Sequence, residues 1–535
     1  MIYIDPPYNT GKDFVYKDNF RDNIKNYLEI TGQVDSDGNK LSTNSETSGR
    51  YHSDWLNMMY PRLKLARNLL KDDGVIFISI DDNEVSNLRK LCDEIFGEDN
   101  FVSSLIFQSN SIKNNAKQLS TVHEYCLVYC KNISIQENWR IVLPNSKKLF
   151  TFFEKLKKFS LSDEERIKRI KEFIKKENIT GSLSNYTKID DKGLFRLDNI
   201  GGVKNGNTTT KLFHPLTKKE CKMSNGGWRY SQEKLEKLLK ENMIYFGENE
   251  ETVPQIKRYL DEEHLAVFNS VIYKDTSQDF KKVDELLNGN NIFDFPKNID
   301  FIVSLLELIV SKEKDSLILD FFSGSATTAH AIMKLNSEDD GNRKFICVQL
   351  PENTDEKSEA YKAGYKNICE IGKERIRRAG EKVKSESGKT ELDIGFKVLK
   401  LDSSNIKSWD SDFENLETNL LDAVENIKSD RNEEDLVYEI LLKYGLDLAL
   451  PIEELNINGK KIFSIGFGSL VCCLDNDIDT NIVEKIAELK KQFETDFGLE
   501  NMRVVFKDSS FKDSVVKTNA LQILKQNGIN EVVSI

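Results

Sequence analysis

The feature that most constrains the fold is an almost entirely apolar run, Val75-Ile76-Phe77-Ile78-Ser79-Ile80. A strand of this kind is typical of a parallel sheet that helices cover on both faces. Upstream, apolar residues recur at intervals of three and four, which predicts an amphipathic helix that starts after an N-cap at Ser53. These residues are Leu56, Met59, Leu63, Ala66 and Leu70. The run and its neighbouring helix predict a layered α/β domain.

The α/β pattern occurs twice, with an irregular Lys-rich stretch between the two occurrences. Residues 1–132 and residues 291–390 show the pattern, residues 133–290 interrupt it, and residues 391–535 form a further segment. Two halves of one sheet with an inserted domain would give this order, and so would two separate α/β domains. Beyond the helix and strand above, we expect strands at 2–4, 105–107, 125–129, 317–320 and 345–350, helices at 83–96 and from about 327, and a polar loop at 10–50.

Charge is distributed unevenly along the chain. The net charge is -12, and residues 391–535 alone hold 28 acidic and 16 basic residues, so the preceding residues balance to zero. Residues 141–180 hold 11 basic against 6 acidic residues, and residues 201–230 hold 6 against 1. Local basic patches attract phosphate whatever the total charge is, although ordinary solvated helix faces would give the same counts.

Composition places the chain among cytoplasmic globular proteins. There is no apolar run long enough for a membrane span, and the start lacks the features of a signal peptide. The 8 cysteines include no Cys-x-x-Cys pair, so we expect buried thiols in a reducing compartment and no metal site.

The strongest chemical motif is Asp5-Pro6-Pro7-Tyr8, directly after the first expected strand. An exocyclic amino group is a poor nucleophile because its lone pair is delocalised into the base. The Asp5 carboxylate and the Pro6 carbonyl would each accept one of its N–H groups and so turn the lone pair toward a methyl donor. The prolines, Pro7 included, stiffen the backbone, and Tyr8 offers a flat face for an extruded base. A plain strand-to-loop turn is the competing interpretation.

A second motif, Asp320-Phe321-Phe322-Ser323-Gly324-Ser325-Ala326-Thr327-Thr328, combines a strand end, a small-residue turn and a helix start. Ligands of open α/β sheets bind at such strand ends, and a helix N-terminus offers N–H groups to a carboxylate. The pattern Gly-x-Gly-x-x-Gly is absent, so a nicotinamide dinucleotide site is not supported. At the end of the next expected strand, Glu352 is a candidate for ribose hydroxyls, with Gln349 as a neutral substitute; a plain surface glutamate is equally compatible.

The order of these motifs around a basic insert resembles the β group of amino-methyltransferases, and several strings resemble modification (Mod) subunits of type III restriction systems. They are YIDPPYNTG (3–11), HSDWLNMMYPRL (52–63), DFFSGSATTAHA (320–331), IGKERIRRA (371–379), DIGFKVLKLDSSN (393–405), LVYEILLKYGLDL (436–448) and VVFKDSSFKDSVVKTNA (504–520). The resemblance covers nearly the whole chain outside 133–290.

The resemblance implies a Rossmann-like methyltransferase sheet that uses S-adenosyl-L-methionine, with a target-recognition insert at 133–290 and a C-terminal α+β domain at 391–535. It implies transfer to adenine N6 in double-stranded DNA, dimerisation through the C-terminal domain, and association with a restriction (Res) subunit that hydrolyses ATP. Asp5, Pro6 and Tyr8 would act at the base. The residues implied or expected at the cofactor are Asp320, Phe322, Ser323, Gly324, Ser325, Thr327 and Glu352.

Some residues depart from the family pattern or have two interpretations. Ala326 stands where many members have glycine, and His330 matches the family string but fits helix packing better. In the insert, Trp228, Arg229 and Tyr230 are candidates for DNA contact or for core packing. Family members also carry a segment before the Asp-Pro-Pro-Tyr strand, whereas this chain starts four residues before Asp5, so we expect a truncated member, a mis-assigned start or half of a split subunit.

Three alternatives stay open at this stage. A cytosine-N4 enzyme presents a similar exocyclic nitrogen, although serine often replaces the aspartate there. A truncated subunit could recognise DNA without methylating it. An RNA or protein methyltransferase is disfavoured because asparagine usually takes the place of Asp5 in those enzymes.

Overall fold

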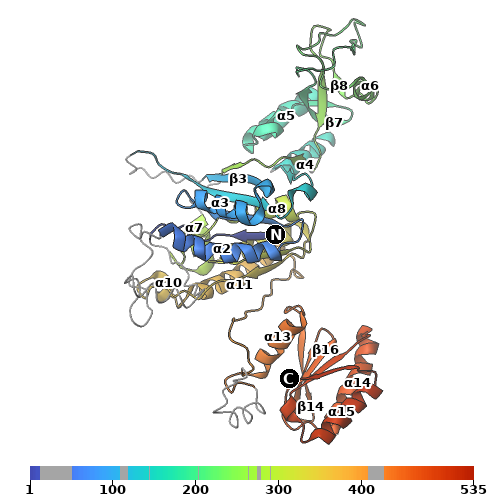
Figure 1. Ribbon diagram of the computed structural model, residues 1–535. Helices are drawn as coiled ribbons and strands as arrows, with labels where there is room; N and C mark the ends of the chain where they lie inside the picture. Colours follow the sequence, from blue (N-terminus) through green and yellow to red (C-terminus); the bar gives the residue numbers. More distant parts are fainter. Residues whose placement is uncertain are drawn as a thin grey trace. The chain divides into compact units, whose positions relative to one another are not determined.

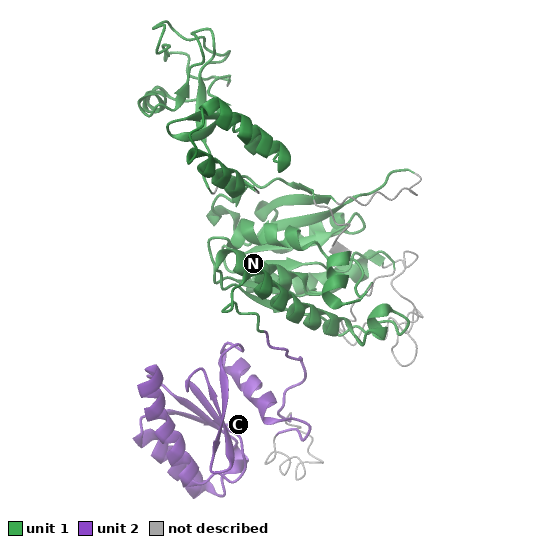
Figure 2. Ribbon diagram, turned by 180° about the vertical axis from the view of Figure 1, so that it is seen from behind, with its two compact units in different colours: residues 1–395 green, residues 396–535 purple. Residues whose placement is uncertain are grey.

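The computed structural model describes residues 1–11, 51–108, 118–143, 145–202, 204–262, 264–273, 279–289, 291–407 and 427–535. The chain divides into two compact units, Met1–Gly395 and Phe396–Ile535, which Figure 1 colours along the sequence and Figure 2 colours by unit. Most of the loop predicted at 10–50 lies outside the described residues.

A seven-stranded sheet forms the centre of the first unit, in the order β11-β3-β4-β2-β1-β12-β13. Its strands are β1 (Ile2–Ile4), β2 (Val75–Ile80), β3 (Phe101–Gln108), β4 (His123–Cys130), β11 (Val271–Tyr273), β12 (Leu317–Asp320) and β13 (Lys344–Cys347). The strands run in one direction except β4, which is antiparallel to β2 and β3. Because β1 and β12 are adjacent, with Ile2 opposite Leu319, the two α/β stretches are halves of one sheet.

Helices cover both faces of this sheet because successive residues of each strand point to opposite faces. Ile76, Ile78 and Ile80 pack with α2 (Tyr51–Leu69) and α3 (Val85–Phe96). Val75 and Phe77 pack with α8 (Ile299–Val310) and α9 (Thr327–Asp339) on the other face. The remaining helices of this part are α7 (Asp279–Leu287), α10 (Glu359–Lys362) and α11 (Ile368–Ser387). The predicted N-cap at Ser53 was wrong, because α2 already includes Tyr51 and His52.

The insert between the halves forms its own sheet, in the order β6-β7-β9-β8. Its elements are β5 (Ile141–Val142), α4 (Ser146–Lys157), α5 (Asp163–Lys176), β6 (Lys188–Asp190), β7 (Gly193–Asn199), α6 (Gln232–Lys240), β8 (Ile244–Tyr245), β9 (Gln255–Tyr259) and β10 (Leu265–Ala266). The expected insert boundary at residue 290 is too late, because β11 at Val271–Tyr273 already pairs with β3 in the main sheet.

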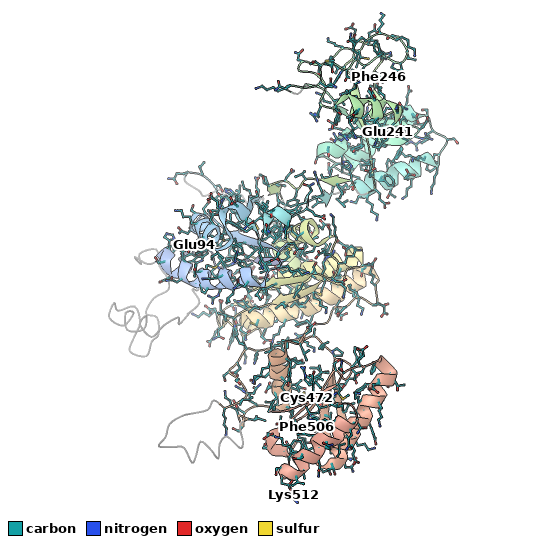
Figure 3. The ribbon with its side chains drawn as sticks, turned by 45° about the vertical axis from the view of Figure 1, so that its right-hand side comes forward. Glu94, Glu241, Phe246, Cys472, Phe506 and Lys512 are labelled. Atoms are coloured by element: carbon teal, nitrogen blue, oxygen red, sulfur yellow. The ribbon has the colours of Figure 1, made fainter. Side chains whose placement is uncertain are left out.

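The second unit contains a five-stranded sheet, in the order β14-β15-β16-β17-β18. Its elements are α13 (Glu433–Tyr444), β14 (Ile452–Ile457), β15 (Lys460–Ile465), β16 (Leu470–Cys473), α14 (Thr480–Phe497), β17 (Arg503–Phe506), α15 (Ser514–Gln526) and β18 (Glu531–Ser534). Cys472 packs in the cluster that contains α13, and Phe506 packs in the one that contains α14 and α15; Figure 3 labels both side chains. The sheet is therefore covered on both faces. In neither unit is any described helix long and apolar enough to span a membrane.

Candidate active site

Asp5 lies at the carboxyl end of β1, next to the turn that follows β12. The strand itself is buried, whereas the Asp5 side chain is 27% exposed. Because Ile2 pairs with Leu319, the chain beyond Ile4 runs beside the residues that follow Asp320. The structure thus brings the two predicted motifs, 315 positions apart in the sequence, to the same edge of the sheet.

The loop after Asp5 is held from the α2 and α3 side. The indole Nε1 of Trp55 donates to the Pro7 carbonyl at 2.7 Å. The Asn9 amide donates to the fully buried Glu84 carboxylate at 2.6 Å, and the Tyr51 hydroxyl donates to the Asn9 carbonyl. No hydrogen bond between described residues uses the Pro6 carbonyl, so this acceptor remains for a substrate N–H while its neighbour is fixed.

A lysine that the sequence analysis did not single out lies in this site. Lys297, which precedes α8, places Nζ 3.2 Å from Asp5 Oδ1, and its side chain is only 14% exposed. Its ammonium also donates to Glu124 Oε2 at 2.6 Å and to the Tyr8 hydroxyl at 2.5 Å. Tyr8 in turn donates to Glu124 Oε2 at 2.9 Å. The four side chains form one charged network around the Asp-Pro-Pro-Tyr motif.

Burial and charge act against each other in this network. Burial raises the pKa of Asp5 above its ordinary value, and the Lys297 ammonium opposes that shift. Burial opposes the ionisation of Glu124 as well, but Lys297 holds the pKa of that carboxyl below its ordinary value. For Lys297, burial lowers the pKa, and the two carboxylates outweigh this effect and raise it. Burial, Asp5 and Glu124 raise the pKa of Tyr8, which stays a neutral hydroxyl.

The predicted cofactor turn, residues 320–327, is built around a carboxyl group that faces inward. Asp320 is 2% exposed, accepts from the Thr328 hydroxyl at 2.5 Å and accepts from the Phe322 amide at 3.2 Å. Its carboxyl group therefore shapes the turn. Gly324 adopts a left-handed conformation with φ +49°, where a Cβ would lie 3.4 Å from the Phe293 ring.

Helix α11 supports the same turn from behind. The fully buried Arg375 donates through Nη1 to the Ser325 hydroxyl at 2.5 Å and to the Thr327 hydroxyl at 2.8 Å. A Cβ on Gly372 would lie 3.3 Å from the Gly324 carbonyl, so glycine allows the helix to approach closely. Arg375 thus brings a positive charge to the start of α9. The sequence string 371–379 resembles the family but does not predict this contact behind the turn.

The other predicted cofactor residues follow β13. Gln349 contacts the turn, since its Oε1 accepts from the Gly324 amide at 2.8 Å. Glu352 is half-buried five residues beyond the end of β13, and its carbonyl accepts from the Ile368 amide at 3.0 Å. The structure therefore brings Gln349 into the turn and places Glu352 at the start of α11.

The remaining candidates separate into core and surface residues. Trp228 is 1% exposed, and its indole donates to the Thr210 carbonyl at 2.8 Å, so it belongs to the core of the insert. Arg229 is exposed, and the Tyr230 hydroxyl accepts from Arg258 at 3.0 Å. His330 is buried in α9, and burial, followed by the charge of Arg375, lowers its pKa to about 3, which fits a neutral packing residue.

The residues around the turn fit the carboxylate of an amino-acid group. Helix α9 begins at Thr327 without a side-chain cap, and Arg375 lies behind it. Such a helix start favours a carboxylate. Phe321 and Phe322 add an apolar surface next to it. This donor set suits the amino-acid part of S-adenosylmethionine.

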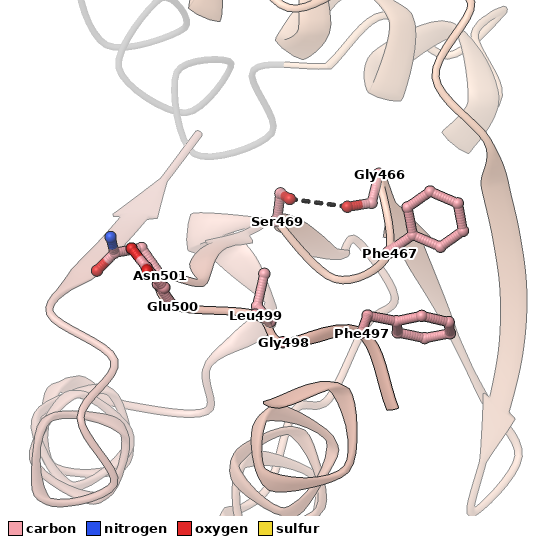
Figure 4. A pocket seen from close by; sticks show the side chains of 8 residues that line it. All are labelled: Gly466, Phe467, Ser469, Phe497, Gly498, Leu499, Glu500 and Asn501. Carbon is pink, nitrogen blue, oxygen red and sulfur yellow. Dashed lines mark hydrogen bonds between the residues drawn. The ribbon is translucent and has the colours of Figure 1, made fainter. Parts of the chain in front are cut away.

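A separate pocket of about 540 Å³ lies in the second unit. Figure 4 shows the rings of Phe467 and Phe497 side by side at its rim, and Ser469 donating to the Gly466 carbonyl. Glu500 is the one ionisable side chain among its lining residues, so the pocket lacks the acceptor pair and the cationic helix start of the first unit.

Comparisons with known proteins identify the relatives of this chain. The family model described as DNA methylase (N6_N4_Mtase) matches residues 1–379. The Mod subunit of the type III restriction-modification enzyme EcoP15I of Escherichia coli is 32% identical over 520 residues, which is 96% of this chain and 78% of that protein. The StyLTI Mod subunit of Salmonella typhimurium is 36% identical over 74% of this chain and 56% of its own length. The type II methyltransferase M.KpnI of Klebsiella pneumoniae is 31% identical over 69% of this chain and 80% of its own length.

Proposed function

Because the chain belongs to the DNA methylase family and is related over 96% of its length to a type III Mod subunit, we propose that it is the modification subunit of such a system and methylates adenine at N6. The observation that carries this proposal is the pair of acceptors at the end of β1. The Asp5 carboxylate and the Pro6 carbonyl lie on consecutive residues, with Pro7 fixed by Trp55.

These two acceptors can bind the two N–H groups of an exocyclic amine. The amine must first leave the base stack, because its nitrogen cannot be attacked in line inside a duplex. Tyr8 then offers the flat ring for the extruded base. As the N–C bond forms and the C–S bond of the donor breaks, positive charge passes from sulfur to nitrogen, and the ionised Asp5 stabilises it. The nitrogen finally releases one proton to water.

S-adenosylmethionine, when bound, would supply the activated methyl group, and the β12–α9 turn is the proposed place for it. Phe322, Ser323, Gly324, Ser325 and Thr327 would hold it at the start of α9, with Asp320 shaping the turn. Glu352 remains the proposed partner of the ribose hydroxyls. Of the residues in this region, Gln349 has the more direct contact with the turn.

Double-stranded DNA is the proposed substrate, and the insert between β4 and β11 is its proposed recognition domain. Lys147 and Lys219 there are 77% and 72% exposed, and residues 141–180 hold 11 basic against 6 acidic residues. Exposed cations on such a domain would neutralise phosphates, and base contacts would set the sequence. A restriction (Res) subunit is a proposed partner, because the relatives are named as Mod subunits of restriction-modification enzymes. A homodimer, and ATP hydrolysis by the Res subunit, are proposed from the family resemblance alone.

Analysis of the methylated nucleoside tests the proposed target. The chain is incubated with S-adenosylmethionine and unmethylated genomic DNA, the DNA is digested, and nucleosides are identified by mass spectrometry. We expect N6-methyladenine, because Asp5 and Pro6 offer the two acceptors that an adenine amino group needs. N4-methylcytosine would contradict the adenine assignment while leaving the family assignment intact.

A further inference from the structure

Lys297 is the one cation that contacts the carboxylate of Asp5 in the described structure. We propose that Lys297 is a positioning residue for methyl transfer, whose ammonium keeps the Asp5 carboxylate ionised and aimed at the target amine while Glu124 anchors the ammonium. This inference rests on the proposed function, because it assigns a role to a side chain in the same site.

Three oxygen atoms lie close to the ammonium of Lys297. Nζ lies 2.6 Å from Glu124, 2.5 Å from the Tyr8 oxygen and 3.2 Å from Asp5 Oδ1. The contact with Asp5 has ion-pair distance but is not aligned as a hydrogen bond, so the buried Oδ1 retains its capacity to accept from a substrate. The ammonium therefore stabilises the charge of Asp5 without using up its acceptor.

The backbone around Lys297 is fixed. Pro296 precedes it, and Asn298 after it is buried and caps α8 by accepting from the Phe301 amide at 2.7 Å. The backbone that carries Lys297 is therefore held in place at the start of α8. The local structure is thus built to hold a cation at this point.

Two carboxylates and one ammonium give the network a net charge of about -1, which suits a reaction that brings positive charge to the amino nitrogen. Without the ammonium, the partly buried carboxylates would repel each other, and one of them would take up a proton. A protonated Asp5 is a weaker acceptor and has lost the negative charge that stabilises the cationic amino nitrogen. The Lys297 ammonium therefore decides whether Asp5 is ionised, and so able to stabilise the target amine, near neutral pH.

Other titratable groups face Asp5 from the surrounding elements. They are Tyr3 from β1, Tyr8 from the following loop, Glu124 and Cys126 from β4, Asp320 from β12 and Lys297 before α8. Burial raises the pKa of Tyr3, Tyr8 and Cys126, which stay neutral near pH 7. Asp320 titrates in the neutral range, so its signal must be separated from that of Asp5 in any experiment.

The test measures methyl transfer against pH in matched variants. In Lys297→Met, we expect the acid limb of kcat to move up by about one pH unit or more, and kcat at pH 7 to fall about tenfold, with little change in KM for the cofactor. In Glu124→Gln, Asp5 is the one carboxylate left beside Lys297. We therefore expect the acid limb of the kcat profile to move to lower pH. Lys297→Arg keeps the charge and should keep most of the activity.

Two further variants separate charge from structure. The double variant Lys297→Met/Glu124→Gln removes one charge of each sign, so it should recover part of the activity lost in Lys297→Met. Lys312→Met is the matched control, because Lys312 is 78% exposed and pairs with the equally exposed Glu137. Should Lys297→Met fail to fold, the downward shift in Glu124→Gln still tests the inference. Unchanged acid limbs in the folded variants would overturn it.

A second readout does not depend on activity. Infrared spectroscopy of protein labelled with 13C-aspartate follows protonated carboxyl groups, and the band lost on adding Asp5→Asn belongs to Asp5. We expect this band to titrate at higher pH in Lys297→Met than in the wild type. If the wild type transfers no methyl group but the band shifts, the proposed function fails, and only the electrostatic effect of Lys297 on Asp5 stands. If methyl transfer occurs and the band does not shift, the role of Lys297 fails alone.

Discussion

At the scale of single residues, two carboxyl groups end neighbouring strands of the sheet, and their surroundings differ. Asp5 has the Lys297 ammonium at 3.2 Å, whereas Asp320 is bound by the Thr328 hydroxyl and the Phe322 amide. Burial raises the pKa of Asp320 to about 7, from an ordinary value of 3.8. The folded protein therefore binds a proton at Asp320 over a range in which the unfolded chain has lost it.

This difference in proton binding makes the free energy of unfolding depend on pH. Between the ordinary value and about pH 7, the folded state holds the extra proton, so the free energy of unfolding should fall as pH rises through this window. Asp320→Asn keeps an acceptor for Phe322 and cannot ionise. Between about pH 5 and pH 8, we expect the free energy of unfolding of the wild type to fall by on the order of 3 kcal/mol more than that of Asp320→Asn. Denaturant unfolding measures this, and parallel pH profiles would contradict the account.

The sequence predicts Asp5 and Tyr8 as site residues because their motif is contiguous and its chemistry is specific. It could not find Lys297 and Glu124, which lie 289 and 116 positions from Tyr8 and are common surface residue types. A proline followed by a lysine directly before an apolar, Asn-capped helix was the available signal, but it is weak by itself. The sequence also could not show that Asp320 faces inward, since the direction of a side chain at a turn depends on the tertiary fold.

At the scale of elements, apolar runs predicted strands well and their direction poorly. The strand predicted at 317–320 and the helix start at Thr327 are confirmed, and the strand at 125–129 lies within β4. The reversal of β4 was not predicted, because a strand buried on both faces has the same apolar pattern in either direction. The start of α2 was missed because tertiary contacts, such as Tyr51 with Asn9, extend it beyond the expected cap.

At the scale of the whole molecule, the family match ends at residue 379 and the first compact unit ends at Gly395. The second unit, Phe396–Ile535, is the proposed site of dimerisation. A chain that ends at Gly395 should therefore be a monomer in light scattering while the full chain is a dimer. Circular dichroism confirms that the shortened chain is folded. A shortened chain that remains a dimer would place the interface in the first unit.

The central claim is that the carboxylate at the end of β1 promotes methyl transfer to DNA. Its most direct test is transfer of radiolabelled methyl from S-adenosylmethionine to unmethylated DNA by the wild type, Asp5→Ala, Asp5→Asn and the surface control Lys312→Met. We expect label with the wild type and the control, and a loss of about 100-fold or more in both Asp5 variants, because both remove the charge that stabilises the cationic nitrogen. Label at the wild-type rate in folded Asp5→Ala, or no label with the folded wild type, would contradict the account.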